Sequence, residues 1–195
     1  MAVNSIQTLR QQIKQRRRSL DEDQHLHWSQ AICRRVLQSS DYAIASRVAA
    51  YLPFRGEVDP RAVLHGAHSD DKSVFVPVVN DNNIAFVPWE PDCPLVKNRY
   101  GIDEPATEGT ALPAGELDLV LCPLVAFDRQ CNRIGMGAGF YDRAFHFVRG
   151  TVKGPRLLGV AFGFQEVGDI DPQPWDIPLH AVVTEAEWIQ AGTTD

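Results

Sequence analysis

A glycine-rich run with an arginine near its start is the stretch of this chain best suited to chemistry. It covers residues 132–142 and places Gly135, Gly137 and Gly139 at alternate positions. Glycine lets a backbone approach a ligand closely and adopts φ values that other residues resist. The residues that follow are predicted to start a helix, where unpaired N–H groups bind anions. The run therefore predicts a phosphate-binding loop, with Arg133 supplying a positive charge.

The run ends in Tyr141 and Asp142. A carboxylate there suits Mg²⁺, which usually binds through one or two carboxylates together with substrate phosphates. The spacing matches neither a Walker loop, which needs Lys-Ser/Thr, nor the Gly-x-Gly-x-x-Gly pattern of dinucleotide-binding folds. The glycines alone fit a tight strand-to-helix connection without a ligand equally well. The charged and aromatic residues on either side favour a functional loop.

Four other features carry polar groups that are candidates for a site. Glu57 follows a predicted strand and is placed to bind a polar ligand edge, although a surface acid is the simpler interpretation. Asp176 lies among bulky apolar residues, as a metal ligand or, more commonly, as a backbone-capping acid. Arg10 borders the apolar stripe of the first helix and could reach toward a phosphate. The basic cluster 14–18 is predicted to be a solvated helix face.

Hydrophobic periodicity and turn residues predict the elements that must position these groups. Helices are expected over residues 3–20, 22–38, 61–67 and 143–148, with Asp21 and Asp59 as caps and Pro60 in the first helical position. Strands are expected over 48–52, 73–79, 84–87, 117–122, 156–162 and 181–184, with a hairpin turn at 80–83, a long ordered loop over 89–116 and an irregular segment over 169–179. This alternation predicts an α/β fold with a mainly parallel sheet, in which ligands gather beyond the carboxyl ends of the strands.

Length and composition predict a single globular domain over residues 1–195. The net charge of -6 argues against nonspecific nucleic-acid binding. No run of apolar residues is long enough to span a membrane, and the polar start lacks a signal core, so a cytoplasmic location is expected. The four scattered cysteines are expected to be reduced and structural.

Several segments together resemble the 5-formyltetrahydrofolate cyclo-ligase family. In chain order they are Leu9-Arg10 with 14–18, 51–59, 100–105, 122–128, 132–142, 175–178 and 182–185. The glycine-rich run with its Tyr-Asp end is the most specific of them. The resemblance implies a three-layer α/β fold with a mainly parallel central sheet, similar to the sugar-phosphate isomerase and CoA-transferase architecture. It also implies that ATP and Mg²⁺ drive the conversion of 5-formyltetrahydrofolate to 5,10-methenyltetrahydrofolate, with release of ADP and phosphate, through phosphorylation of the formyl oxygen.

The resemblance assigns roles to individual residues. It places ATP on Arg10, Arg133, Ile134, Gly135, Met136, Gly137, Ala138, Gly139, Phe140 and Tyr141, and the folate on Leu52, Glu57, Met136, Gly137, Ala138, Gly139 and Phe140. It places Mg²⁺ on Asp142 and Asp176, and it makes Arg133 and Tyr141 the catalytic residues. The partners implied are the folate and ATP, with no nucleic acid, membrane or obligate protein partner.

Two positions depart from the family pattern. Ile6 stands where many members have a lysine, and His180 stands where an acid is frequent. Alternative hypotheses are an isomerase or CoA-transferase relative that binds phosphate on the same loop without hydrolysing ATP, and a noncatalytic folate or nucleotide binder. An RNA-binding protein that uses residues 14–18 fits the acidic composition least well.

Overall fold

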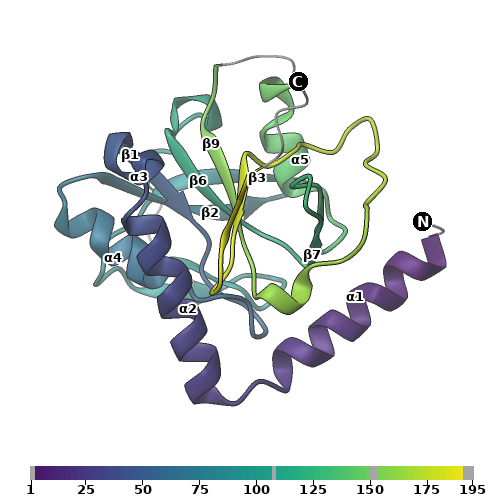
Figure 1. Cartoon of the computed structure of the whole chain (residues 1–195). Helices are drawn as coiled ribbons and strands as arrows, with labels where there is room; N and C mark the ends of the chain where they lie inside the picture. Colours follow the sequence, from purple (N-terminus) through teal and green to yellow (C-terminus); the bar gives the residue numbers. More distant parts are fainter. Residues whose placement is uncertain (1–2, 107–108, 150–152, 191–195) are drawn as a thin grey trace.

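A seven-stranded sheet runs through the middle of the molecule in the computed structural model, which describes residues 3–106, 109–149 and 153–190 (Figure 1). Its strands are β1 (Arg47–Ala50), β2 (Ser73–Asn80), β3 (Asn83–Pro88), β6 (Leu119–Pro123), β9 (Arg156–Val160), β10 (Ala181–Val183) and β11 (Trp188–Gln190). Their order is β11-β10-β9-β6-β1-β2-β3. The five inner strands are parallel, and the edge strands β3 and β11 are antiparallel to their neighbours. The predicted α/β fold with a mainly parallel sheet is confirmed.

Apolar side chains cover both faces of this sheet. In β6, Leu119 and Leu121 point to one core, whereas Val120 and Cys122 point to the other. Helices α2 (Glu22–Leu37), α3 (Ser40–Ile44) and α4 (Arg61–Ser69) pack on the first face. The short α5 (Phe140–Ala144) and η2 (His146–Val148) cover the second. Burial on both faces explains why these strands read as continuous apolar runs rather than alternating ones.

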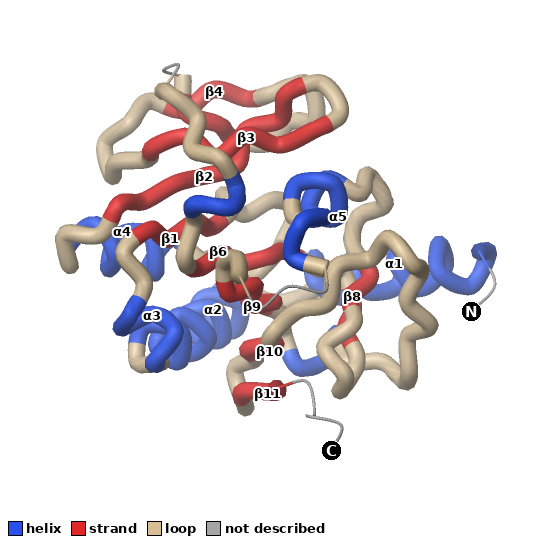
Figure 2. Tube along the Cα trace, turned by 90° about the horizontal axis from the view of Figure 1, so that it is seen from above, coloured by secondary structure: helices blue, strands red, loops and turns tan. Residues whose placement is uncertain are grey.

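Helix α1 (Val3–Arg18) lies apart from the other helices, on the side of the molecule away from α3 and α4 (Figures 1 and 2). Its Ile6 and Leu9 pack against Ile134 and Ile170. Ile134 belongs to a small hairpin of β7 (Ala126–Phe127) and β8 (Arg133–Ile134). The apolar stripe of α1 therefore faces segments distant in the chain, at the end of the sheet where the glycine-rich run begins.

The predicted helix starts are confirmed in one case and corrected in another. Asp21 caps α2 by accepting a hydrogen bond from the Gln24 N–H at 2.8 Å. Pro60 occupies the cap position of α4 rather than its first turn, so that prediction was displaced by one residue. The Asp59 carboxylate still accepts a bond from the Arg61 N–H at 3.0 Å.

The segment predicted as a long loop contains short structure. It includes β4 (Leu95–Lys97), β5 (Asp103–Pro105) and η1 (Ala114–Glu116). The buried Glu104 carboxylate fixes this segment to β2 by accepting bonds from the Val79 N–H and the Asn98 side chain, both at 2.7 Å. Strands of three residues are too short to show alternation, which also explains why β11 was not predicted.

The helix expected over residues 143–148 is wrong in extent. Helix α5 begins at Phe140, with Gly139 as its N-cap at a φ of +66°, and it ends at Ala144. The 3₁₀ turn η2 follows. The left-handed glycine starts the helix earlier than the hydrophobic pattern indicated, because it turns the chain directly out of the glycine-rich run.

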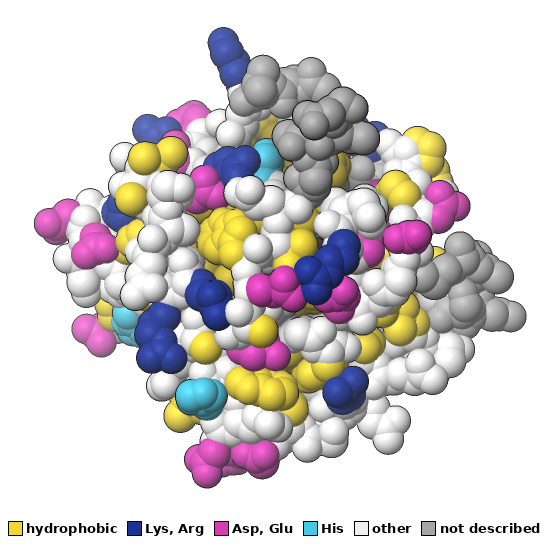
Figure 3. Space-filling model, viewed as in Figure 1, with side chains coloured by type: hydrophobic (Ala, Val, Ile, Leu, Met, Phe, Trp, Pro, Cys, Tyr) yellow, Lys and Arg dark blue, Asp and Glu magenta, His cyan; other side chains and the backbone are white. Residues whose placement is uncertain are grey.

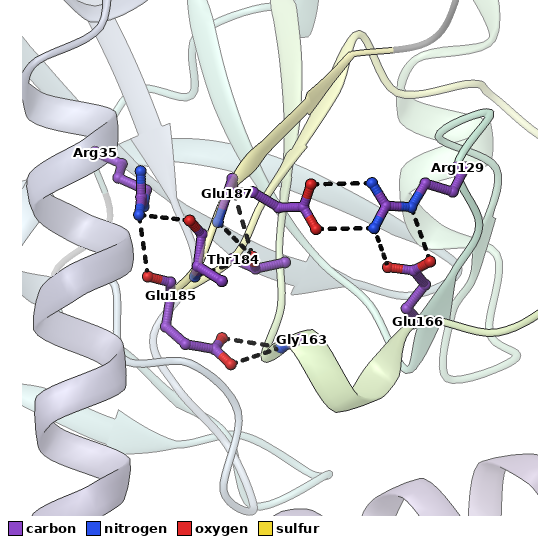
Figure 4. Close-up of polar contacts among 8 residues, drawn as sticks. Arg35, Arg129, Gly163, Glu166, Thr184, Glu185 and Glu187 are labelled. Carbon is purple, nitrogen blue, oxygen red and sulfur yellow. Dashed lines mark hydrogen bonds and ion pairs between the residues drawn. The ribbon is translucent and has the colours of Figure 1, made fainter.

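Acidic and basic side chains lie side by side near the centre of the face seen in Figure 1 (Figure 3). There Arg129 contacts the carboxylates of Glu166 and Glu187 at 2.8–3.1 Å (Figure 4). Glu185 accepts bonds from the Gly163 N–H, and Arg35 of α2 donates to the carbonyls of Glu185 and Ala186. This network joins the loop after β7 to the turn between β10 and β11.

We expect Arg129→Met to lower the melting temperature modestly, by about 1–4 °C at low salt. The ion pairs are exposed, so screening should remove most of this difference in about 1 M NaCl. Thermal unfolding of both proteins at two salt concentrations measures it. A difference that is unchanged by salt would mean that packing of the arginine stem, not its charge, stabilises the fold.

Candidate functional site

A cavity of about 1190 Å³ opens at the carboxyl ends of β1, β2 and β6. Its walls come from the segment after β1, the glycine-rich run, α1, and the irregular segment 169–179. The residues predicted for the site all line it: Arg10, Leu52, Glu57, Arg133, Ile134, Gly135, Met136, Gly137, Ala138, Gly139, Phe140, Tyr141, Asp142 and Asp176. The fold thus brings these residues together, while their individual roles remain predictions.

Two of the three alternate glycines are required by the backbone. Gly137 has a φ of +105° and Gly139 a φ of +66°, in the region that side chains rarely adopt. A Cβ on Gly137 would make only an ordinary van der Waals contact with the Arg10 guanidinium, at 3.6 Å, so the φ is the constraint. Gly135 has no positive φ, and a Cβ there would meet nothing within 4 Å. Gly137 and Gly139 therefore determine the path of the loop backbone, and the space beside Gly135 is open.

Arg10 crosses from α1 to the glycine-rich run. Its Nε donates to the carbonyl oxygen of Gly135 at 2.9 Å, across 125 residues of chain. This contact orients the guanidinium along the loop and supports the expectation that Arg10 extends past the apolar stripe. Ile6, one turn earlier on the same helix, also lines the cavity. Helix α1 is thus a wall of the site.

Arg133 and Asp142 form an ion pair within the cavity wall. Arg133 Nη2 lies 2.6 Å from Asp142 Oδ1, and the two side chains are 6% and 22% exposed. Arg133 Nη1 donates to the carbonyl of Ile177 at 2.5 Å, and the Ile177 N–H donates to Asp142 Oδ1 at 3.1 Å. The pair therefore joins β8 and α5 to the irregular segment, and Arg133 has a structural function in addition to the predicted catalytic one.

The two predicted magnesium ligands face one cavity but differ in their partners. Asp176 Oδ2 accepts a bond from the Gln173 N–H at 2.8 Å, the capping arrangement that was the commoner expectation for this residue. Asp142 accepts bonds from Arg133 and from the Ile177 N–H through Oδ1. Within the described ranges, no three His, Cys, Asp or Glu side chains gather as a metal site. This donor set suits an ion such as Mg²⁺ that takes its remaining ligands from phosphates and water.

Glu57 is a buried carboxylate on the cavity wall. Its side chain is 9% exposed, and Oε2 accepts a bond from the Phe54 N–H at 3.2 Å. Burial raises the pKa of Glu57, while Arg17 opposes that shift. Arg17 Nη1 lies 3.8 Å from Glu57 Oε1. The interpretation of Glu57 as a surface acid is wrong.

Arg17 also corrects the expectation for the basic cluster. The residue is 2% exposed, whereas Arg16 and Arg18 on either side are exposed. The apolar stripe of α1 contained the signal, because Arg17 follows Ile13 by four residues and so shares its helical face. The run 14–18 is therefore not a uniform solvated face, because Arg17 points inward.

Tyr141 stands in the wall of the cavity with its ring 6.1 Å from that of Phe145. Burial raises the pKa of its hydroxyl well above the ordinary value. The hydroxyl is therefore protonated at neutral pH and can donate a hydrogen bond into the cavity. The buried thiols of Cys33 and Cys122 have pKa values raised to about 12, and the four cysteines, all described, form no disulfide.

The parallel sheet and the cavity at its carboxyl edge define an α/β protein with a candidate ligand site where the glycine-rich run, the first helix and the strand ends meet. The family model described as the 5-formyltetrahydrofolate cyclo-ligase family matches residues 2–185. The chain belongs to this family.

Individual relatives agree with this assignment. The 5-formyltetrahydrofolate cyclo-ligase of Escherichia coli K12 is 36% identical over 183 residues, which cover 90% of this chain and all of the relative. The enzyme of the same name from Haemophilus influenzae is 32% identical and covers 94% of this chain and 99% of its own length. An NMR structure of Aquifex aeolicus 5,10-methenyltetrahydrofolate synthetase superimposes with a TM-score of 0.83 at 29% identity, covering 97% and 94% of the two chains.

The different constraints on the glycines give a direct test of the loop. We expect Gly137→Ala to destabilise the protein by about 1–2 kcal/mol, because alanine is strained at this positive φ. Gly135→Ala is the matched control and should change the free energy of unfolding by less than about 0.5 kcal/mol. Urea unfolding measures both. Equal losses would contradict the division of roles among the glycines.

Proposed function

We propose that this chain is a 5-formyltetrahydrofolate cyclo-ligase that uses residues 1–195 as one catalytic domain. It catalyses the ATP-dependent cyclisation of 5-formyltetrahydrofolate to 5,10-methenyltetrahydrofolate, with release of ADP and phosphate. The observation that carries the proposal is the match to the family over residues 2–185, together with the gathering of the predicted site residues in one cavity.

Different walls of the cavity suit different parts of the substrates. The Glu57 carboxylate is an acceptor for the N–H groups along the edge of the pterin ring, and Leu52 supplies apolar surface beside it. The glycine-rich run, with Arg10 and Arg133 on either side, supplies N–H groups and positive charge for the ATP phosphates. Met136 and Phe140 belong to the same run and also line the cavity.

The reaction needs positioning and charge stabilisation more than covalent chemistry from the protein. The formyl oxygen attacks the γ-phosphorus of ATP, and ADP leaves. The nitrogen at position 10 then attacks the activated formyl carbon, and phosphate departs with the former formyl oxygen while that nitrogen loses its proton. Arg133 and the loop N–H groups stabilise negative charge on the transferred phosphoryl group. The neutral Tyr141 hydroxyl donates a hydrogen bond at the formyl end.

Asp142 and Asp176 would hold Mg²⁺ with the phosphates. The bound ion would neutralise phosphate charge and polarise the transferring group. Asp142 has an additional duty, since its Oδ1 accepts bonds from Arg133 and Ile177. The same carboxylate therefore sets the position of the arginine that faces the phosphoryl group.

The activity is tested by mixing the protein with 5-formyltetrahydrofolate, ATP and Mg²⁺ and following the near-ultraviolet absorbance band of the methenyl product. We expect the band to grow, and to depend on both ATP and Mg²⁺, with one phosphate released for each product formed. A folded protein that binds ATP but forms no methenyl product would count against the proposed function.

A variant of Asp142 tests the magnesium site. Asp142→Asn keeps an acceptor for the Ile177 N–H but removes the charge, so kcat should fall roughly 100-fold. The Mg²⁺ concentration for half-maximal rate should rise by about tenfold or more. Asp169→Asn, at an exposed position of the irregular segment, is the control and should match the wild type. An unchanged Mg²⁺ dependence in Asp142→Asn would remove Asp142 from the metal site.

A further inference from the structure

Arg17 is a buried charge that the substrate contacts proposed above do not use. Glu57 lines the cavity, whereas Arg17 does not; the Arg17 guanidinium stands behind Glu57. Nη1 lies 3.8 Å from Glu57 Oε1 and donates a long hydrogen bond of 3.4 Å to the carbonyl of Leu124. Nε and Nη2 are buried without a hydrogen-bond partner.

This arrangement is a poor way to stabilise a fold. Burying a guanidinium with two unsatisfied nitrogens costs free energy, and a single ion pair of this length repays little of it. An apolar side chain of similar length would fill the same space without that cost. A positive charge kept here therefore points to a purpose other than packing, and its only nearby carboxylate among the described contacts is Glu57.

The loop that carries Glu57 is built around Arg17. The Glu57 N–H donates to the Phe54 carbonyl at 3.2 Å, which closes a tight turn in which Arg55 and Gly56 both have positive φ. A Cβ on Gly56 would lie 3.2 Å from the carbonyl oxygen of Arg17. The end of α1 thus supports the turn through its backbone and the carboxylate through its side chain.

Charge around the carboxylate decides which form Glu57 takes. The titratable and charged groups that face Glu57 are Arg17 and Lys14 of α1, His25 of α2, Tyr51 after β1, and Tyr141 of α5. His25 contacts the residue through its backbone, with Nε2 2.8 Å from the Glu57 carbonyl oxygen. Both tyrosines have raised pKa values and stay neutral, and the Tyr51 hydroxyl donates to the carbonyl of Val58 at 2.8 Å. Arg17 is the largest contribution that favours the ionised carboxylate, ahead of Lys14.

We propose that Arg17 is a positioning residue that holds Glu57 as an anionic acceptor, aimed at a donor-rich edge of the substrate ring. An ionised carboxylate only accepts hydrogen bonds, whereas a protonated one donates. Arg17 therefore selects ligands whose ring edge presents N–H and NH₂ groups together. This inference rests on the proposed placement of the pterin ring against Glu57.

The test is the pH dependence of folate binding in the absence of turnover. Equilibrium dialysis with 5-formyltetrahydrofolate, from about pH 6 to about pH 9, compares the wild type with Arg17→Met, Arg17→Lys and Glu57→Gln. Arg18→Met is the matched control, because it removes the same charge from the exposed neighbouring position. Binding of ATP to each protein and its thermal unfolding report on the rest of the site and on folding.

Arg17→Met should weaken folate binding by about tenfold or more at neutral pH, since a charge-assisted bond is lost. Without the arginine the pKa of Glu57 rises, so affinity should recover as the pH increases and the carboxyl group ionises. Arg17→Lys should restore most of the affinity, and Arg18→Met should behave as the wild type. ATP affinity should stay within about twofold in all of these.

A double variant separates action through Glu57 from a structural effect. In the Glu57→Gln background, adding Arg17→Met should change folate affinity by less than about twofold. A full additional loss there, or a pH-independent loss in Arg17→Met, would overturn the proposal. If Arg17→Met fails to fold, a folded Arg17→Lys protein with weakened, pH-independent binding would overturn it equally. Folate binding without turnover in the wild type would count against the proposed function alone.

Discussion

The hydrogen bond from Arg10 to the carbonyl of Gly135 joins the first helix of the chain to the loop on which the site is built. Helix α1 contacts the rest of the molecule through Ile6 and Leu9 near its start and through Arg17 near its end. Its position therefore determines where Arg10 and Arg17 stand relative to the cavity. The parallel sheet supplies the strand ends, but this one helix turns them into an enclosed site.

Two ion pairs lie at the wall of the cavity, Arg133–Asp142 within it and Arg17 behind Glu57, and they differ in quality. The Arg133–Asp142 pair is short and each partner has further hydrogen bonds, so its desolvation is largely compensated. The Arg17–Glu57 pair is long and leaves two arginine nitrogens unsatisfied. Removing one partner of a buried pair commonly costs about 3–5 kcal/mol, because the other charge is left alone. Variants at the first pair therefore change the fold as well as the chemistry.

The sequence predicted most of the sheet, and the residues that it predicted for the site line one cavity, for separate reasons. Strands buried on both faces appear as apolar runs, and a glycine-rich run with charged ends marks a loop that approaches a ligand. The short strands β4, β5 and β11 could not be predicted, because their three residues show neither alternation nor the purely apolar run that indicated β10. Nor could the Arg133–Asp142 pair, since a contact between β8 and α5 depends on tertiary packing. The burial of Arg17 could be predicted from its position on the helical face, but its contact with Glu57 could not.

The separation of α1 from its packing partners has a consequence during synthesis. This helix emerges from the ribosome before β7, β8 and the segment that contains Ile170, against which Ile6 and Leu9 pack. Until those residues are made, an amphipathic helix with a basic end has no surface to bury its apolar stripe. Transiently exposed apolar surface promotes aggregation and chaperone capture. The apolar stripe of α1 therefore depends for its burial on residues that are made after most of the chain.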